Sequence, residues 1–227
     1  MKRALSATAA VVATAALLAP LVATADHAPG HKKNANPNLT ISAEPSPVTW
    51  PKRVTVSGVL RGSDRAAKTV ELQAKPHPFT GAFREVATTT TNEDGDYTFL
   101  HRPDEHTAYR VVADLNPDEI SGEATVRSRM KITRRVSNRR PLDGQEITFF
   151  GRVGPAHEGM DVLIQRRRPS GRWKTMTTAP LGEALPDGTS AYSTEVKMNR
   201  DGVWRARVRK DENHLGNKSR RVRINVL

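Results

Sequence analysis

Apolar and polar residues alternate along several short stretches of this chain. The alternation is clearest in residues 203–210 and 109–114. The apolar positions are Trp204, Ala206 and Val208 in the first stretch and Tyr109, Val111 and Ala113 in the second. Because successive side chains of a β-strand point to opposite faces, this period of two predicts strands with one buried face and one face in solvent.

The same pattern, interrupted by Gly, Pro, Asn and Asp, recurs along residues 39–227. Strands are expected near residues 39–43, 53–60, 69–75, 83–90, 96–100, 107–114 and 123–130, and again near 131–136, 145–153, 160–167, 172–178, 191–197, 203–210 and 219–227. No long segment keeps apolar residues at the three-four spacing of an amphipathic helix. Seven short strands in each half predict an all-β protein built from two antiparallel β-sandwiches.

The two halves align as copies of one unit. The matched segments are 54–58 with 147–151, 70–73 with 162–165 and 81–83 with 171–173, while Tyr97 matches Tyr192 and Tyr109 matches Trp204. The offsets change only in predicted loops. We therefore expect two domains, at residues 39–130 and 131–227, with hardly any linker between them. In the second copy a longer loop at residues 185–192 replaces the Asp-Gly-Asp-Tyr turn of the first.

The order of these segments resembles a known family. A strand ending in Gly is followed by Val-x-Leu-Gln, Gly-x-Phe/Trp, Asp-Gly-x-Tyr-x-Phe, Tyr-Arg-Val and a valine-rich last strand. This pattern is similar to the immunoglobulin-like repeats of secreted proteins from high-GC Gram-positive bacteria. The resemblance implies two tandem seven-stranded immunoglobulin-like antiparallel β-sandwiches that act as spacer or adhesion modules. It supplies no catalytic residues.

The N-terminal residues predict export. Lys2 and Arg3 precede an Ala-rich apolar run that ends in Ala-Thr-Ala, so residues 1–25 are expected to be a signal peptide. Residues 26–38 lack apolar periodicity and are expected to form a disordered leader. With no membrane span expected after signal removal, the protein is predicted to be secreted, extracellular or loosely associated with the cell wall. The chain has no Cys, which excludes disulfides and thiolate metal sites.

Charge distinguishes the two halves. Residues 39–131 hold 12 Lys and Arg against 13 Asp and Glu, whereas residues 132–227 hold 20 against 10. The formal net charge of the whole chain is +12, and most of it lies in the second half. The two copies therefore differ mainly in surface charge.

Arginines follow the outward phase of three predicted strands in the second half. These residues are Arg167, Arg205, Arg207, Arg209, Arg221 and Arg223. In an immunoglobulin-like topology the third, sixth and seventh strands are neighbours in one sheet, so the six side chains are expected to cover one face. Like charges on adjacent strands cost about 0.2–1 kcal/mol per pair.

Two interpretations of this face remain open. It is either a solvated basic surface, screened by salt beyond about 8–10 Å, or a binding face for anionic cell-surface polymers, since arginine forks suit phosphate and carboxylate groups. The same charge would attract nucleic acid. Specific nucleic-acid binding is not expected, because Trp204 points inward and no aromatic residue is predicted on the face to stack with bases.

No catalytic, cofactor-binding or metal-binding motif stands out. His27 and His31 lie in the expected leader, the segment 101–106 has a Pro between its two histidines, and His157 has no second His at helical spacing. The acidic residues around Gly95 are typical of a turn rather than of a calcium loop. No catalytic residue, cofactor or metal is therefore assigned, and the protein is expected not to be an enzyme.

The aromatic residues offer little for sugar binding. Phe83 and Trp173 occupy matching positions in the two copies and are expected in the cores. Trp50 has no counterpart and is the one candidate for an exposed sugar-binding platform.

Together these observations predict a secreted, non-enzymatic structural or adhesion module whose second domain binds an anionic cell-wall polymer. The alternative is an accessory or inhibitor protein that binds an extracellular protein through loops such as 181–190.

Overall fold

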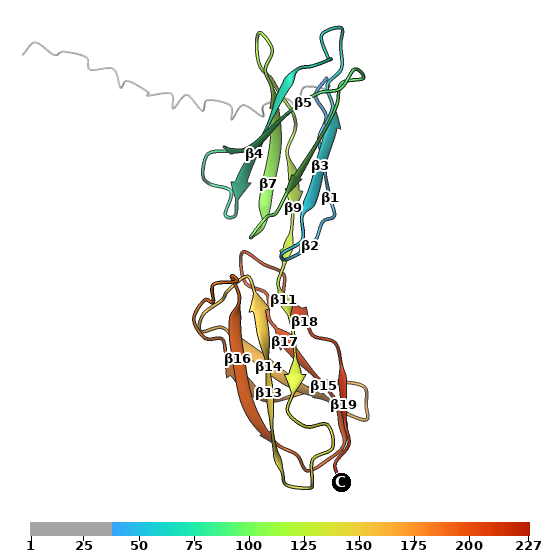
Figure 1. The fold of residues 1–227 in the computed structure, drawn as a ribbon, viewed down its shortest axis with the longest axis vertical. Helices are drawn as coiled ribbons and strands as arrows, with labels where there is room; N and C mark the ends of the chain where they lie inside the picture. The colour runs from blue at the N-terminus through green and yellow to red at the C-terminus, as the bar shows by residue number, and fades with distance from the viewer. Residues whose placement is uncertain (1–37) are drawn as a thin grey trace, which may run out of the picture. The chain divides into compact units, whose positions relative to one another are not determined.

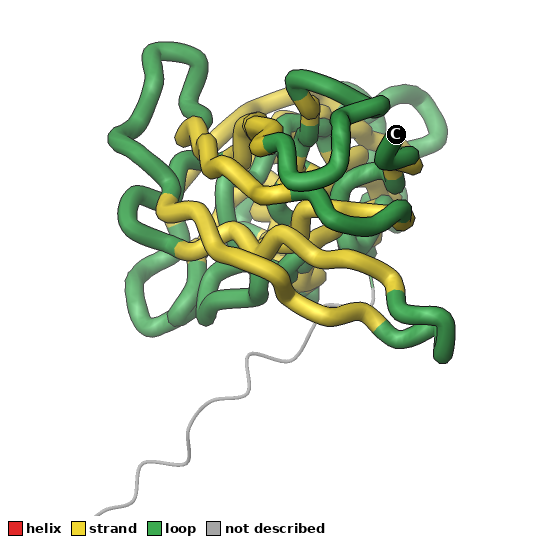
Figure 2. The backbone as a smooth tube through the Cα atoms, turned by 90° about the horizontal axis from the view of Figure 1, so that it is seen from below, coloured by secondary structure: helices red, strands yellow, loops and turns green. Residues whose placement is uncertain are grey.

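The computed structural model describes residues 38–227. The expected signal peptide at 1–25 and the part of the expected leader before Asn38 lie outside the described residues. Residues 38–227 consist of strands, turns and loops and contain no helix (Figure 2). The all-β class predicted from the alternating pattern is thus confirmed. In this part of the chain no helix has the length and apolar character needed to cross a membrane.

The first part of the fold comprises two antiparallel sheets around one core (Figure 1). One sheet has the order β1-β3-β6; in the other, β4 lies between β5 and β7, and both β8 and β9 pair with β7. The bounds are β1 Ser42–Glu44, β3 Val54–Val59, β4 Thr69–Pro76, β5 Arg84–Thr90, β6 Asp96–His101, β7 Thr107–Ala113, β8 Glu119–Ile120 and β9 Ala124–Val126. Inward side chains from both sheets, including Val56, Leu72 and Tyr109, belong to the same buried cluster.

The second part of the fold repeats this arrangement around a separate core. In one sheet β13 lies between β16 and the short strands β11 and β12; in the other, β14 lies between β15 and β17, and both β18 and β19 pair with β17. The bounds are β11 Lys131–Ile132, β12 Arg135–Val136, β13 Glu146–Gly154, β14 Asp161–Arg167, β15 Trp173–Pro180, β16 Ser190–Lys197, β17 Gly202–Val208, β18 Asn217–Lys218 and β19 Val222–Ile224. Phe149, Ile164 and Trp204 lie in its core. Two layers around each core are consistent with β-sandwiches.

One buried residue connects the two parts. Met130 lies between β10 (Ser128–Arg129) and β11, and its side chain is fully buried. Its N–H donates to the carbonyl of Leu215 at 3.0 Å, and its carbonyl accepts a hydrogen bond from the side-chain amide of Asn217 at 2.7 Å. β10 also pairs in parallel with β2 (Val48–Thr49). The chain therefore passes between the two parts with its backbone groups already bonded.

Every predicted strand overlaps an observed one, but the terminal strands are shorter and more divided. The stretch expected as one strand at 123–130 contains β9 and β10, and that expected at 131–136 contains β11 and β12. The two-residue strands β2, β8 and β18 were not predicted. Strands of this length carry no periodic pattern, because pairing with a neighbour rather than burial of alternate residues defines them.

A tyrosine hydrogen bond occurs at matching places in both parts. The hydroxyl of Tyr97 donates to the carbonyl of Thr40, and the hydroxyl of Tyr192 donates to the carbonyl of Thr133 at 2.8 Å. Gly151 faces the second bond: a Cβ there would clash with the carbonyl of Thr133 and lie 2.9 Å from the Tyr192 ring. The glycine therefore lets the tyrosine approach the neighbouring backbone.

Two further features recur. The hydroxyl of Ser121 accepts the N–H of Val111 at 2.9 Å, and that of Ser219 accepts the N–H of Ala206 at 3.0 Å. The pairing between the first two strands of each larger sheet shifts register at the same place, just before Gln73 in β4 and just before Gln165 in β14. These contacts identify which residue of one larger sheet corresponds to which residue of the other.

Candidate functional site

The outward face of sheet β15-β14-β17-β19 carries a group of arginines. On β17, Trp204, Ala206 and Val208 are buried, so the alternation turns Arg205 and Arg207 outward. We call the outward side chains of this sheet the arginine face: Arg167, Arg205, Arg207, Arg221 and Arg223 with Gln165 and Trp173. The predicted neighbourhood of the third, sixth and seventh strands is observed, since β14 and β19 both pair with β17.

Arg205 is held at the centre of the arginine face. Its Nε donates to Oε1 of Gln165 at 2.9 Å, and its guanidinium carbon lies 3.9 Å from the ring centroid of Trp173. Gln165 is itself only 5% exposed, and its amide donates to the hydroxyl of Thr175 at 3.2 Å. Arg221 approaches the same ring at 5.7 Å. The central guanidinium is therefore ordered by a hydrogen bond and a cation–π contact, not by an acid.

The charges of the arginine face have no acidic partner. Among residues 38–227, none of its arginines forms an ion pair. Burial, followed by the positive charges of Arg207 and Arg221, lowers the pKa of the Arg205 guanidinium. An arginine remains protonated at neutral pH despite such a shift, so the repulsion persists. A bound anion would relieve it.

The remaining predicted site residues lie at the margins of this face. Nε of Arg167 donates to the carbonyl of Gly171 at 3.3 Å, and Nε of Arg223 donates to Oδ1 of Asn225 at 3.1 Å. Arg209 is exposed beyond the end of β17.

The basic residues of this region line two separate grooves. One is lined by Arg205 and Arg207 together with Arg129, Lys210 and Lys218. The other is lined by five arginines and one acid: Arg166, Arg167, Arg168, Arg200, Arg223 and Asp201. Sequence reasoning missed Lys218, which pairs directly with Arg207 across β17 and β18, because β18 is too short to show a pattern.

The matching face in the first part of the fold has the same central contact. The guanidinium carbon of Arg110 lies 4.3 Å from the ring centroid of Phe83, and its Nε donates to Oε1 of Gln73 at 2.7 Å. Nζ of Lys75 lies 4.2 Å from the same ring and 3.7 Å from a carboxylate oxygen of Glu123. The cation–aromatic–glutamine arrangement is therefore shared, and here an acid accompanies it.

The acids of the first face are missing from the second. The register shifts match Gln165 with Gln73, so Leu163 corresponds to Glu71 and Thr175 to Glu85. The serine contacts match Ser219 with Ser121, so Arg221 corresponds to Glu123. The same framework thus presents a mixed-charge face in one part and a basic face in the other.

The expectation that Phe83 and Trp173 lie in the cores is wrong. Both side chains are only partly buried, lie outside the two core clusters and are covered by cations on the outward faces. The two aromatic residues match because each packs against an arginine on the outward face, not because each lies in a core. The argument that the basic face has no aromatic residue is therefore wrong as well, since Trp173 lies within it.

Trp50 is not an exposed sugar platform. Its side chain is 9% exposed, and its indole N–H donates to Oδ1 of Asp104 at 3.2 Å. The ring fills the space beside Gly154, where a Cβ would clash with it, and lies near Gly188. Asp187 of the loop 181–190 also forms an ion pair with Arg152, so this loop is tied to the body of the protein.

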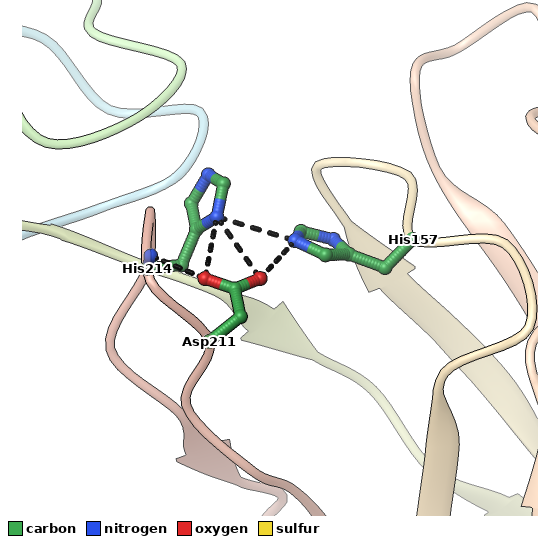
Figure 3. Close-up of side chains that lie close together, drawn as sticks. All are labelled: His157, Asp211 and His214. Carbon is green, nitrogen blue, oxygen red and sulfur yellow. Dashed lines mark hydrogen bonds and ion pairs between the residues drawn. The ribbon is translucent and has the colours of Figure 1, made fainter. Parts of the chain in front are cut away.

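A second cluster was not predicted from the sequence. His157, in the loop between β13 and β14, meets Asp211 and His214, in the loop between β17 and β18 (Figure 3). Nε2 of His157 lies 2.8 Å from Oδ2 of Asp211, and Nδ1 of His214 lies 3.2 Å from Oδ1 of Asp211. Among residues 38–227, these three side chains are the group that lies close enough together to hold a metal ion. Spacing alone gives no signal for a cluster assembled from two distant loops.

The other histidine and acidic candidates have local roles. Nδ1 of His101 lies 2.8 Å from the hydroxyl of Tyr109, and Nδ1 of His106 accepts the N–H of Ser128 at 2.9 Å. Oδ1 of Asn92 accepts the N–H groups of Asp94 and Asp96. The predicted turn around Gly95 is therefore confirmed. His27 and His31 lie outside the described residues.

Comparison with models of known protein families finds no match. Comparison with curated proteins also finds no match.

Proposed function

We propose that this chain is a secreted, non-enzymatic structural or adhesion module whose second domain binds anionic cell-surface polymer through the arginine face. In this proposal residues 39–130 and 131–227 are tandem seven-stranded immunoglobulin-like β-sandwiches, and the protein acts outside the cell or loosely held at its wall. The separate cores and the repeated sheet order support the two-domain organisation. The matching tyrosine, serine and bulge positions support duplication of one unit.

The contrast between the two outward faces carries the binding proposal. Both faces keep a cation stacked on an aromatic ring and bonded to a glutamine. Only the second lacks the acid, since Arg221 stands where Glu123 pairs with Lys75 in the first. Stability alone would favour mixed charges, because like charges on neighbouring strands are destabilising. An unbalanced face is therefore better explained by a ligand that supplies the negative charge.

An extended ligand suits the distribution of the basic residues. They line two grooves, one containing Arg205 and Arg207 and the other containing Arg167 and Arg223. A phosphate- or uronate-bearing polymer offers repeated anionic groups that arginines bind in bidentate fashion. Many weak contacts along one chain add to a useful affinity through their effective concentration.

The test is a binding titration against poly(glycerol phosphate) and polygalacturonate at low and at physiological salt. The triple variant Arg205→Ser, Arg207→Ser, Arg221→Ser should bind at least tenfold more weakly at low salt. A matched variant with Arg135→Ser, Arg139→Ser and Arg140→Ser removes the same charge from exposed residues in and just after β12, which belongs to the other sheet. It should bind nearly as well as the unmodified protein.

Three outcomes contradict the proposal. The first is that the protein binds neither polymer. The second is that the Arg205, Arg207, Arg221 variant binds as tightly as the unmodified protein. The third is an equal loss of binding in both triple variants, which would indicate attraction by net charge without a defined face. Single-stranded DNA serves as a comparison, because Trp173 lies on the face. Tighter binding of DNA than of both wall polymers would redirect the proposal to nucleic acid.

A further inference from the structure

We propose that His157, Asp211 and His214 form a binding site for one divalent transition-metal ion of the zinc type. Figure 3 shows the two rings and the carboxylate directed toward a common point. Nε2 of His157 and Nδ1 of His214 lie 3.2 Å apart, and both approach the oxygens of Asp211. This inference is independent of the polymer-binding proposal, since it uses none of the arginines.

The hydrogen bonds on the far sides of the rings determine where the protons lie. Nδ1 of His157 lies 2.7 Å from the carbonyl of Pro155, and Nε2 of His214 lies 2.7 Å from the carbonyl of Asp104. A carbonyl oxygen only accepts, so each of these nitrogens carries a proton. In the neutral form of each ring, the nitrogen that faces the other ring holds a lone pair and can bind a cation.

This outer arrangement is the one that metal-binding histidines use. A ligating imidazole commonly donates its other N–H to a backbone carbonyl or a carboxylate, which fixes the tautomer and the ring orientation. Here both rings do so. Oδ1 of Asp211 also accepts the N–H groups of Asn213 at 2.9 Å and His214 at 2.5 Å, which orients the carboxylate. The donors are therefore positioned before any ion arrives.

The centre of the cluster holds only acceptors when both rings are neutral. Two imidazole nitrogens and the carboxylate converge there, and all the donor atoms lie within 4.8 Å of one another. A single divalent cation satisfies all three groups at once.

The distances fit a tetrahedral ion. With metal–ligand bonds of about 2.0–2.1 Å, the donors of a tetrahedral zinc site stand about 3.3 Å apart. With Oδ2 of Asp211 as the oxygen ligand, the observed separations are 3.2 Å between the two nitrogens, 3.4 Å from Nδ1 of His214 to Oδ2 and 2.8 Å from Nε2 of His157 to Oδ2. The first two match a tetrahedral site, and the third would have to lengthen when an ion binds. Two nitrogens and one oxygen are a donor set that suits zinc better than calcium or magnesium.

The expected role is to fix the two loops that supply the ligands. Asp211 and His214 lie in the loop that also contacts the first part of the fold, through the carbonyl of Asp104 and through the N–H of His106, which donates to the carbonyl of Asn213 at 3.0 Å. The side chains of His157 and Asp211 are 13% and 25% exposed, so solvent reaches part of the cluster.

The test uses the purified full chain after treatment with a chelator and dialysis. Calorimetric titration with Zn²⁺ should give one site per chain, and Co²⁺, used as a spectroscopic probe, should give the visible absorption of a four-coordinate site. Zinc should also raise the Tm, because it binds the folded state. The variants His157→Gln and Asp211→Asn should each weaken zinc binding at least tenfold and abolish the rise in Tm.

The choice of variants keeps the test independent of folding. Asp211→Asn retains an oxygen for the two N–H groups, and His214 is left intact because its ring also bonds Asp104. His101→Gln and the pair His27→Gln, His31→Gln are the matched controls and should bind zinc normally. The absence of zinc binding, or binding that survives both cluster variants, overturns the proposal. Loss of binding in the His27, His31 pair instead assigns the ion to the N-terminal segment and overturns it as well.

Discussion

Arg205 stacks on Trp173, with its guanidinium carbon 3.9 Å from the centre of the indole ring. The two residues come from neighbouring regions of one sheet, β17 and the start of β15, with β14 between them. The contact orders a cation without neutralising it. A guanidinium held in this way would lose less conformational freedom on binding an anion than a mobile one.

Replacing Trp173 with Ala should weaken polymer binding by roughly two- to fivefold, the factor that corresponds to an exposed cation–π contact. Trp173→Phe keeps an aromatic face, as Phe83 does under Arg110, and should retain most of the affinity. Both variants are measured in the titration described for the triple variants. If Trp173→Ala binds as tightly as the unmodified protein, the stack does not organise Arg205 for binding.

Replacing Arg221 with Glu restores the acid that stands at the matching position of the first part. The change should raise the free energy of unfolding by about 0.2–1 kcal/mol, because it replaces repulsion between strands with attraction. The same change should weaken polymer binding. Urea denaturation and the binding titration give the two values.

Arg220→Glu is the control for this prediction, since it makes the same charge change one residue away at an exposed position. It should affect polymer binding less than Arg221→Glu does. Equal weakening by both variants, or a loss of stability in Arg221→Glu, would contradict the assignment of Arg221 to the arginine face.

Gly151→Ala should lower the free energy of unfolding by about 1–3 kcal/mol, the usual cost of overpacking. The added Cβ would clash with the carbonyl of Thr133 and press on the ring of Tyr192. Gly182→Ala is the matched control, because the nearest atom to its Cβ would be 3.7 Å away. Its effect should remain within about 0.5 kcal/mol. Similar urea midpoints for the two variants would show that the tyrosine contact tolerates displacement.

Stability should decrease as the pH falls below about 6.5, the ordinary pKa of histidine in an unfolded chain. Burial lowers the pKa of His101, whose Nδ1 lies 2.8 Å from the hydroxyl of Tyr109. Between the two pKa values the unfolded chain binds more protons than the folded one, so acid favours unfolding. His101→Gln should reduce the slope of unfolding free energy against pH in this range. Identical slopes for the two proteins would show that His101 does not contribute.

The alternating strands could be predicted because their information is local. The period of two in residues 203–210 determines which side chains of β17 enter the core, and the observed burial of Trp204, Ala206 and Val208 follows it. The neighbourhood of β14, β17 and β19 was predicted through the resemblance to immunoglobulin-like repeats. The short strands β2, β8 and β18 carry no such signal.

Side chains whose surroundings come from distant loops could not be predicted. The burial of Trp50 depends on Asp104, Gly154 and Gly188, which lie far along the chain. The cluster of His157, Asp211 and His214 likewise requires two loops to meet. Trp173 was misplaced for a different reason: matching positions show that two residues share a role, but not whether the role is in the core.

Met130 has a mechanical consequence. It is the only residue between β10 and β11, and both its N–H and its carbonyl are already bonded. No flexible linker lies between β10 and β11 that could lengthen under a pulling force. The force would therefore act directly on the hydrogen bonds to Leu215 and Asn217. Extension would have to begin by breaking folded structure rather than by straightening a tether.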